Sequence, residues 1–285
     1  MNTGDPAGRP KRPKTKARLE QLITQWQKDS GYPVSRLNLR IAAMMIAGAL
    51  ARVVDPEGRA AFATKGGIAM ELRMRGKART TNDIDLVLRG DPDQLADLLD
   101  EGLAAPYEGF SFRRGEIASL PHRAEFRKVK VQVIFAGRVL SSPQLEISPA
   151  ETGHEKFIAV PGLSLDAVGL DGPETVLVLD TRWQIAQKLH AVTEEYPDGY
   201  ENPRFRDLVD LQLLEALEAD LPAVRQACEQ VFAARGAQTW PPRLITQPSW
   251  PEGYAALAEE LEMNPTDVET AADAVQAFID RIATA

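Results

Sequence analysis

Two glycines and two aspartates limit what this chain can fold into more than any other feature. Thr64-Lys65-Gly66-Gly67 follows a short apolar run, and Asp83-Ile84-Asp85 begins after fifteen intervening residues. Side chains alternate between the two faces of a strand, so Asp83 and Asp85 are expected to point to one side of a sheet. Paired glycines let a turn approach a bound group closely, and that group is often phosphate. The pattern predicts metal-assisted transfer of a nucleotidyl or phosphoryl group.

This chemistry needs a metal ion to neutralise phosphate charge, and magnesium prefers one or two carboxylates together with phosphate oxygens and water. Asp83 and Asp85 are therefore the expected ligands of Mg²⁺ or Mn²⁺. Gly66 and Gly67 precede a predicted helix, whose N-terminus suits an anion, and Lys65 lies beside them. The other interpretation is a solvent-facing strand end next to an ordinary tight turn, although a turn explains one glycine better than both.

Apolar periodicity and turn residues predict an α+β chain in three parts. Residues 1–17, rich in Pro, Lys, Gly and Arg, are expected to be disordered. Residues 18–175 should form an α/β core and residues 176–285 a helical domain. The expected strands span residues 61–64, 84–88, 110–113 and 123–135, and residues 143–173 look irregular or composed of short strands. The expected helices of the last part span residues 181–195, 204–218, 222–235, 253–262 and 265–283.

Composition excludes several classes of protein. A hydrophobic content of 44% with 26% charged residues is that of a globular protein, and no apolar run reaches the roughly 20 residues of a membrane span. The single cysteine, Cys228, excludes an internal disulfide and fits a reducing cytoplasm. Three scattered histidines and one cysteine give no zinc spacing, so any metal should be bound by oxygen.

The charge is unevenly distributed along the chain. The net charge is −8, and residues 251–285 contain eight acidic side chains against the single Arg281, which leaves −1 for the other 250 residues. Basic residues gather in three clusters, 9–18, 73–79 and 113–130. A polyanionic partner on one face is one explanation, and solvated strand and loop faces are the other.

The helical half contains charged residues on apolar helices. Lys188 borders the apolar stripe of helix 181–195, where a lysine either extends to water or turns toward an anion. Helix 204–218 is apolar nearly all round, yet it carries Asp207 and Asp210 one turn apart. A buried carboxylate requires a partner, and Lys188 is the distant candidate. Such a pair would serve either an active site or the packing of the helical half.

Three motifs resemble the AbiEii/AbiGii toxin family of the nucleotidyltransferase superfamily, over about residues 35–260. The first motif combines Lys65-Gly66-Gly67-Ile68-Ala69 with Arg79-Thr80-Thr81-Asn82-Asp83-Ile84-Asp85-Leu86. The second is Gln184-Ile185-Ala186-Gln187-Lys188-Leu189, and the third is Arg204-Phe205-Arg206-Asp207-Leu208-Val209-Asp210-Leu211. Arg235-Gly236 and Trp240-Pro241 fit the family more loosely.

The resemblance implies a mixed β-sheet core with flanking helices and a toxin controlled by a cognate antitoxin. Some such toxins transfer a pyrimidine nucleotide from a nucleoside triphosphate to the 3′ acceptor end of tRNA, which blocks translation. By analogy, Asp83 and Asp85 would bind the metal ion, and Lys188 and Asp210 would be catalytic. The residues expected to contact the nucleotide are Lys65, Gly66, Gly67, Arg79 and Thr81.

Many proteins of the superfamily place a third carboxylate on a later strand beside the first two. The natural strand here is 129–135, where Gln132 would face the site, and a glutamine cannot ionise. Asp210 is the expected substitute. Two other functions stay open: a nucleotidyltransferase that modifies small molecules such as aminoglycosides, and a nucleotide- or RNA-binding relic without turnover. The basic residues around Asp83 disfavour the first, and Gln132 motivates the second.

Overall fold

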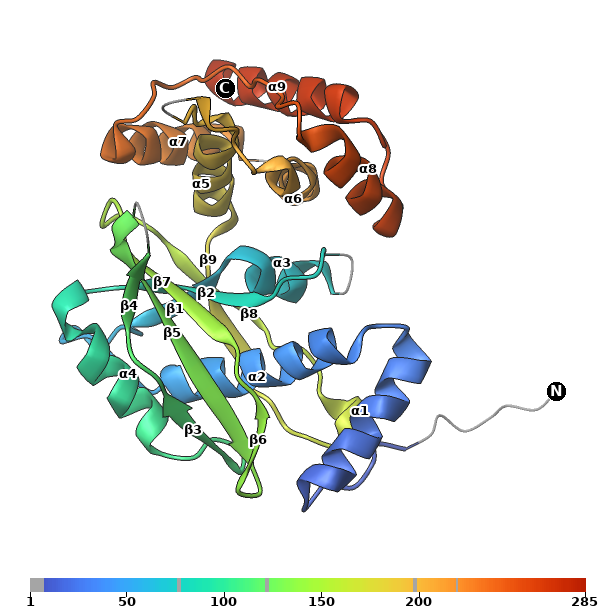
Figure 1. Ribbon diagram of the computed structural model, residues 1–285. Helices are drawn as coiled ribbons and strands as arrows, with labels where there is room; N and C mark the ends of the chain where they lie inside the picture. The colour runs from blue at the N-terminus through green and yellow to red at the C-terminus, as the bar shows by residue number, and fades with distance from the viewer. Residues whose placement is uncertain (1–7, 76–77, 121–122, 197–198, 219) are drawn as a thin grey trace. The chain divides into compact units, whose positions relative to one another are not determined.

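The computed structural model describes residues 8–75, 78–120, 123–196, 199–218 and 220–285 (Figure 1). Residues 1–7 of the tail expected to be disordered, and residues 76–77 of the basic cluster 73–79, lie outside this part. The chain divides into two compact units. Unit 1 comprises residues 1–75, 80–149 and 158–178, and unit 2 comprises residues 76–79, 150–157 and 179–285.

A mixed sheet is the centre of unit 1. Nine strands of the described residues form it, in the order β3-β5-β7-β2-β1-β9-β8, with β4 and β6 pairing with β5. The strands are β1 (Phe62–Lys65), β2 (Asp83–Leu88), β3 (Phe110–Arg114), β4 (Ala118–Leu120), β5 (Arg123–Phe135), β6 (Arg138–Ser141), β7 (Gln144–Pro149), β8 (Phe157–Pro161) and β9 (Thr175–Leu179). The predicted α+β class is confirmed.

Strand β2 lies in the middle of this sheet. It pairs antiparallel with β1 and parallel with β7. Ile84, Leu86 and Leu88 are buried on one face, whereas Asp83 and Asp85 alternate onto the other. The sheet thus has an apolar face for the core and a polar face at the start of β2.

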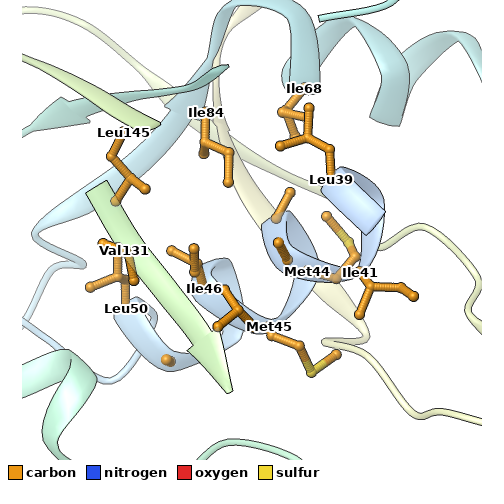
Figure 2. Packing of buried hydrophobic residues seen from close by; sticks show 14 of the residues in the cluster. Leu39, Ile41, Met44, Met45, Ile46, Leu50, Ile68, Ile84, Val131 and Leu145 are labelled. Atoms are coloured by element: carbon orange, nitrogen blue, oxygen red, sulfur yellow. The ribbon is translucent and has the colours of Figure 1, made fainter. Parts of the chain in front are cut away.

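The apolar face packs against helices of unit 1: α1 (Lys16–Ser30), α2 (Val34–Leu50) and α4 (Leu95–Ala104), the last preceded by a 3₁₀ turn at Pro92–Gln94. Helix α2 is buried over most of its length, as its nearly continuous apolar sequence predicts. Figure 2 shows Met44, Ile46 and Leu50 of this helix among Ile84, Val131 and Leu145 of the strands. Helix α3 (Gly66–Met74) also contributes to this hydrophobic core, through residues such as Ile68.

The first described residues contact unit 1 through ion pairs. Arg9 pairs with Asp166 at 3.1 Å and also with Asp171. Arg12 pairs with Glu108 at 2.8 Å and with Asp171 at 3.3 Å. All these side chains are about one-third exposed or more. Exposed ion pairs contribute about 0–1 kcal/mol each to the free energy of unfolding, so these pairs add little to stability.

The last segment of unit 2, residues 179–285, consists mainly of helices. Its helices are α5 (Thr181–Thr193), α6 (Phe205–Glu215), α7 (Leu221–Arg235), α8 (Trp250–Glu260) and α9 (Val268–Thr284). Trp250, Tyr254 and Phe278 are its largest fully buried side chains. Among the described residues, no helix has the length and apolar character that crossing a membrane requires.

Candidate functional site

The predicted aspartate pair lies at the start of β2, on the polar face of the sheet. Asp83 and Asp85 are both half-buried. Burial raises the pKa of Asp83, and the negative charge of Asp85 raises it further. A bound cation would stabilise the ionised form of Asp83 beside the negative charge of Asp85, so the pair has the electrostatic character of a cation site.

The paired glycines lie against this aspartate pair. Helix α3 begins at Gly66, whose φ is +60°, and a Cβ atom there would lie 2.0 Å from Oδ2 of Asp85. A Cβ atom on Gly67 would lie 2.5 Å from Cβ of Thr81, and the Thr81 hydroxyl donates to the carbonyl of Asp83 at 3.3 Å. The fold therefore brings the two halves of the motif together, at a helix N-terminus suited to an anion.

We expect Gly66→Ala to destabilise the protein more than a glycine replacement elsewhere. Alanine at positive φ costs about 1–2 kcal/mol, and here its Cβ would also displace Asp85. Gly137→Ala is the matched control, because Gly137 has φ +75° with no atom within 4 Å of the added Cβ. Urea unfolding of both variants measures the difference. Equal losses in the two variants would show that Asp85 does not lie against the turn.

Lys65 joins the same polar face from β1. Its backbone pairs with that of Asp85, and its Nζ donates to the Ser148 hydroxyl at 2.6 Å. The ammonium also lies 5.2 Å from the centre of the Phe126 ring. These contacts hold the Lys65 ammonium on the strand next to Asp85. An anion bound at the N-terminus of α3 would lie near this positive charge.

Glu146 is the carboxylate on the strand next to β2, and the expectation that strand 129–135 places Gln132 beside the aspartates was wrong. Strand β7 is the neighbour of β2, and Glu146 is in register with Asp85. Paired residues of adjacent strands point to the same face, so Glu146 shares the face of the aspartates. Gln132 instead pairs with Arg113 on β3, beyond the end of the β5–β7 pairing at Lys130. Strand β5 is two strands away from β2, roughly 9 Å across the sheet.

A sequence signal for Glu146 existed in Leu145-Glu146-Ile147. An acid between two apolar residues is the pattern of a short strand with one buried face, and Leu145 and Ile147 are both buried. The segment lies next to Pro143 and Pro149, and those prolines favoured an irregular connection in the prediction. The long alternation of β5 was the stronger signal and drew the prediction to Gln132.

This face can supply the one or two carboxylate ligands that a magnesium ion requires from a protein. Among the described residues, no three Asp, Glu, His or Cys side chains are grouped closely enough to hold a metal ion by themselves. Magnesium does not need such a group, because it takes one or two carboxylates and fills its other positions with phosphate oxygens and water. Glu146 is engaged by the Gln144 side chain at 3.1 Å. Asp83 and Asp85 are therefore the pair that would hold the metal.

The remaining predicted residues meet in unit 2. Lys188 of α5 donates from Nζ to Asp207 at 2.6 Å and to Asp210 at 2.7 Å, both on α6. Arg79 donates from Nε to Oδ1 of Asp210 at 3.1 Å and from Nη2 to Oδ2 at 3.0 Å. The Asp210 side chain is fully buried. The expected pairing of Lys188 with Asp210 is confirmed, and Arg79 joins it.

Charge pairing sets the protonation of this cluster. Burial alone would raise the pKa of Asp210, but the positive charges of Lys188 and Arg79 hold it below its usual value. Burial alone would lower the pKa of Lys188, and Asp207 and Asp210 together raise it instead. A carboxylate with a lowered pKa and two cationic donors is a weak proton acceptor. The geometry favours a positioning role for Asp210 over that of a base, and its catalytic role stays a prediction.

The chain matches a known protein family over most of its length. Residues 48–281 match the family described as nucleotidyl transferase AbiEii toxin, type IV toxin–antitoxin system. The chain belongs to this family. The resemblance predicted from its motifs is confirmed, and membership of the AbiEii family makes the chain a nucleotidyltransferase toxin whose system implies a cognate antitoxin.

One solved structure shows the same fold at low sequence identity. MenT4, a nucleotidyltransferase toxin from Mycobacterium tuberculosis H37Rv, is 19% identical, with 90% of this chain and 82% of that one covered, at a TM-score of 0.53. A putative nucleotidyltransferase from H. pylori is 14% identical, with 88% and 96% of the two chains covered, at a TM-score of 0.42. None of the curated proteins compared with this chain matches it. The likeness to MenT4 supports the nucleotidyltransferase fold.

Proposed function

We propose that this AbiEii protein transfers a nucleotide, from a pyrimidine nucleoside triphosphate, to the 3′ acceptor end of tRNA and so blocks translation. The observation that carries the proposal is the alignment of Asp83, Asp85 and Glu146 on one sheet face, with Asp85 against the N-terminus of α3. Phosphoryl transfer chiefly requires positioning and charge stabilisation, and this face offers both.

The reaction forms a bond from the acceptor hydroxyl oxygen to the α-phosphorus and breaks the bond from that phosphorus to the β-phosphate, releasing pyrophosphate. Magnesium bound to Asp83 and Asp85 would neutralise triphosphate charge. The backbone amides of Gly66 and Gly67, with the Lys65 ammonium, would bind phosphate oxygens. Glu146, in register with Asp85, is our candidate to accept the hydroxyl proton.

The Arg79–Lys188–Asp207–Asp210 cluster belongs to unit 2, and its part in the reaction is a separate proposal. Lys188 would stabilise phosphate charge, as the family resemblance implies, while Asp207 and Asp210 fix its side chain. Asp210 would also fix Arg79 through two of its donors. Thr81, whose hydroxyl binds the carbonyl of Asp83, would order the loop before β2.

The sheet face has further basic residues that suit an RNA backbone. Lys128 is in register with Glu146, and Lys130 is in register with Gln144, so both share the face of the aspartates. An RNA acceptor bound there would place its phosphates against these cations. A polycationic aminoglycoside acceptor would be repelled by them. A nucleotide- or RNA-binding relic without turnover is the less favoured alternative, because Glu146 offers a carboxylate in register with Asp85.

The direct test incubates purified protein with total tRNA and each labelled nucleoside triphosphate in turn, with Mg²⁺ or with EDTA. We expect label on tRNA from one or two of the four triphosphates, only when Mg²⁺ is present. Asp83→Ala should give none. Transfer at the full rate in EDTA would reject the metal, and label on another acceptor but not on tRNA would reject the substrate.

A further inference from the structure

A cavity of about 430 Å³ lies in unit 1, away from the aspartate pair. Its volume falls in the range of small-molecule sites, roughly 300–1,000 Å³. The lining residues come from the α1–α2 connection, α2, the end of α3, and the end of β8 with the residues that follow it. They include two arginines but no acidic residue: Tyr32, Arg40, Leu72, Arg75, Pro161, Gly162, Leu163 and Ser164. The cavity is therefore positively charged.

Arg40 enters the cavity with unused hydrogen-bonding capacity. Its side chain is only 9% exposed, and its Nε donates to Glu71. The guanidinium carbon lies 4.3 Å from the centre of the Tyr32 ring and 6.0 Å from that of Trp26. Within the described part of the chain, no acceptor is placed for its Nη1 and Nη2 groups. The Tyr32 ring and the Glu71 carboxylate thus hold the guanidinium group in place, with its two Nη groups available as donors.

Arg36 of α2 lies beside Arg40 and contacts the same carboxylate. Its Nε donates to Glu71 at 3.2 Å, its Nη1 donates to the Thr80 hydroxyl at 3.4 Å, and its side chain is 5% exposed. Arg40 contacts Glu71 through Nε, so an anion in the cavity would bind the Nη groups of Arg40 without displacing this contact.

Arg75 supplies a second cation at the rim of the cavity. It follows the last residue of α3 and adopts φ +46°, a conformation that usually favours glycine at this position. Its side chain is exposed and has no ion-pair partner among the described residues. This backbone conformation is that of a helix C-cap, and it leaves the exposed guanidinium group of Arg75 available to a ligand in the cavity.

We propose that this cavity binds a phosphate group, through the Nη donors of Arg40 and the side chain of Arg75. One planar guanidinium group can donate two parallel hydrogen bonds to two oxygens of a phosphate. Two arginines that line one cavity are therefore suited to a phosphate group. The inference rests on the proposed function, which supplies an RNA substrate: the phosphate belongs to the RNA backbone, remote from the transferred nucleotide. A free nucleotide offers the same chemistry, and the experiment separates the two sources.

The experiment measures binding of labelled tRNA by fluorescence anisotropy at several KCl concentrations, without any nucleoside triphosphate. Nucleoside triphosphate affinity is measured separately. Arg75→Gly removes the cation and relieves the positive φ, so its melting temperature should equal or exceed that of the wild type. Arg40→Lys keeps the charge opposite Glu71 and loses the fork. Arg138→Ala, at an exposed position outside the cavity, is the matched loss of charge.

We expect Arg75→Gly and Arg40→Lys each to weaken tRNA binding by about 3- to 10-fold, without changing the affinity for nucleoside triphosphates. Arg75→Gly, which removes a charge, should also lower the salt slope by about 1. Arg138→Ala should bind tRNA and nucleoside triphosphates like the wild type. Weaker triphosphate binding with unchanged tRNA binding would assign the phosphate to a free nucleotide. If Arg75→Gly and Arg40→Lys both bind tRNA and nucleoside triphosphate with the affinities of Arg138→Ala, the cavity is not a phosphate site. If the two cavity variants bind tRNA more weakly but the wild type transfers no nucleotide to tRNA, the proposed reaction is rejected and the cavity site is kept. If the wild type transfers nucleotide but both variants bind tRNA normally, the cavity site is rejected and the reaction is kept.

Discussion

Asp83→Asn and Asp85→Asn are each expected to reduce nucleotide transfer by at least about a thousandfold. The change removes the negative charge of a carboxylate and keeps its size, so a loss of this kind reports charge and not packing. Metal-assisted stabilisation of phosphate charge is worth several kcal/mol, and each 1.36 kcal/mol is tenfold in rate. The measurement is the initial rate of label incorporation into tRNA at saturating Mg²⁺. Asp97→Asn, at an exposed position on α4, is the matched control and should retain full activity.

The position of the third carboxylate is tested in the same assay. Glu146→Gln should lower the rate by about 10²- to 10⁴-fold, the usual contribution of a proton acceptor. Gln132→Ala should have no comparable effect, because Gln132 pairs with β3 and not with the strand next to β2. A large loss in Gln132→Ala with activity retained in Glu146→Gln would reverse our assignment. Full activity in both aspartate variants would reject the polar face of β2 as the reaction site.

Local signals were sufficient to predict the centre of the site. The glycine pair, the helix that it begins and the alternation of Asp83 and Asp85 all depend on residues close in sequence, and all appear in the fold. Glu146 was missed because strand pairing is non-local. The sequence does not state that β7, only six residues long, inserts between β2 and the longer β5.

The buried cluster of unit 2 was predictable in part for the same reason. A carboxylate on a helix that is apolar nearly all round must have a partner, and this argument identified Lys188 for Asp210. Arg79 lies 131 positions away from Asp210, and no periodicity connects them. The sequence therefore indicated that a buried charge needed compensation, while the second compensating residue emerged only from the fold.

Asp210→Ala is expected to destabilise unit 2 by about 3–5 kcal/mol. Removing one member of a buried ion cluster leaves its partners uncompensated, and here Lys188 and Arg79 both lose an acceptor. Urea unfolding of the whole chain, followed by helical circular dichroism, gives the free energy. Asp273→Ala, exposed on α9, is the control and should stay within about 0.5 kcal/mol of the wild type.

The pH dependence of this loss separates charge from packing. Because the folded protein lowers the pKa of Asp210, the stabilisation by this carboxylate is present above its ordinary pKa of about 4 and is lost as pH falls through the lowered value. We therefore expect the difference between wild type and Asp210→Ala to be constant from about pH 5 to 8 and to shrink below about pH 4. Adding Lys188→Met to Asp210→Ala should recover part of the loss, since it removes one uncompensated charge. A difference that persists unchanged into acid, with no recovery in the double variant, would mean that Asp210 stabilises α6 by packing alone.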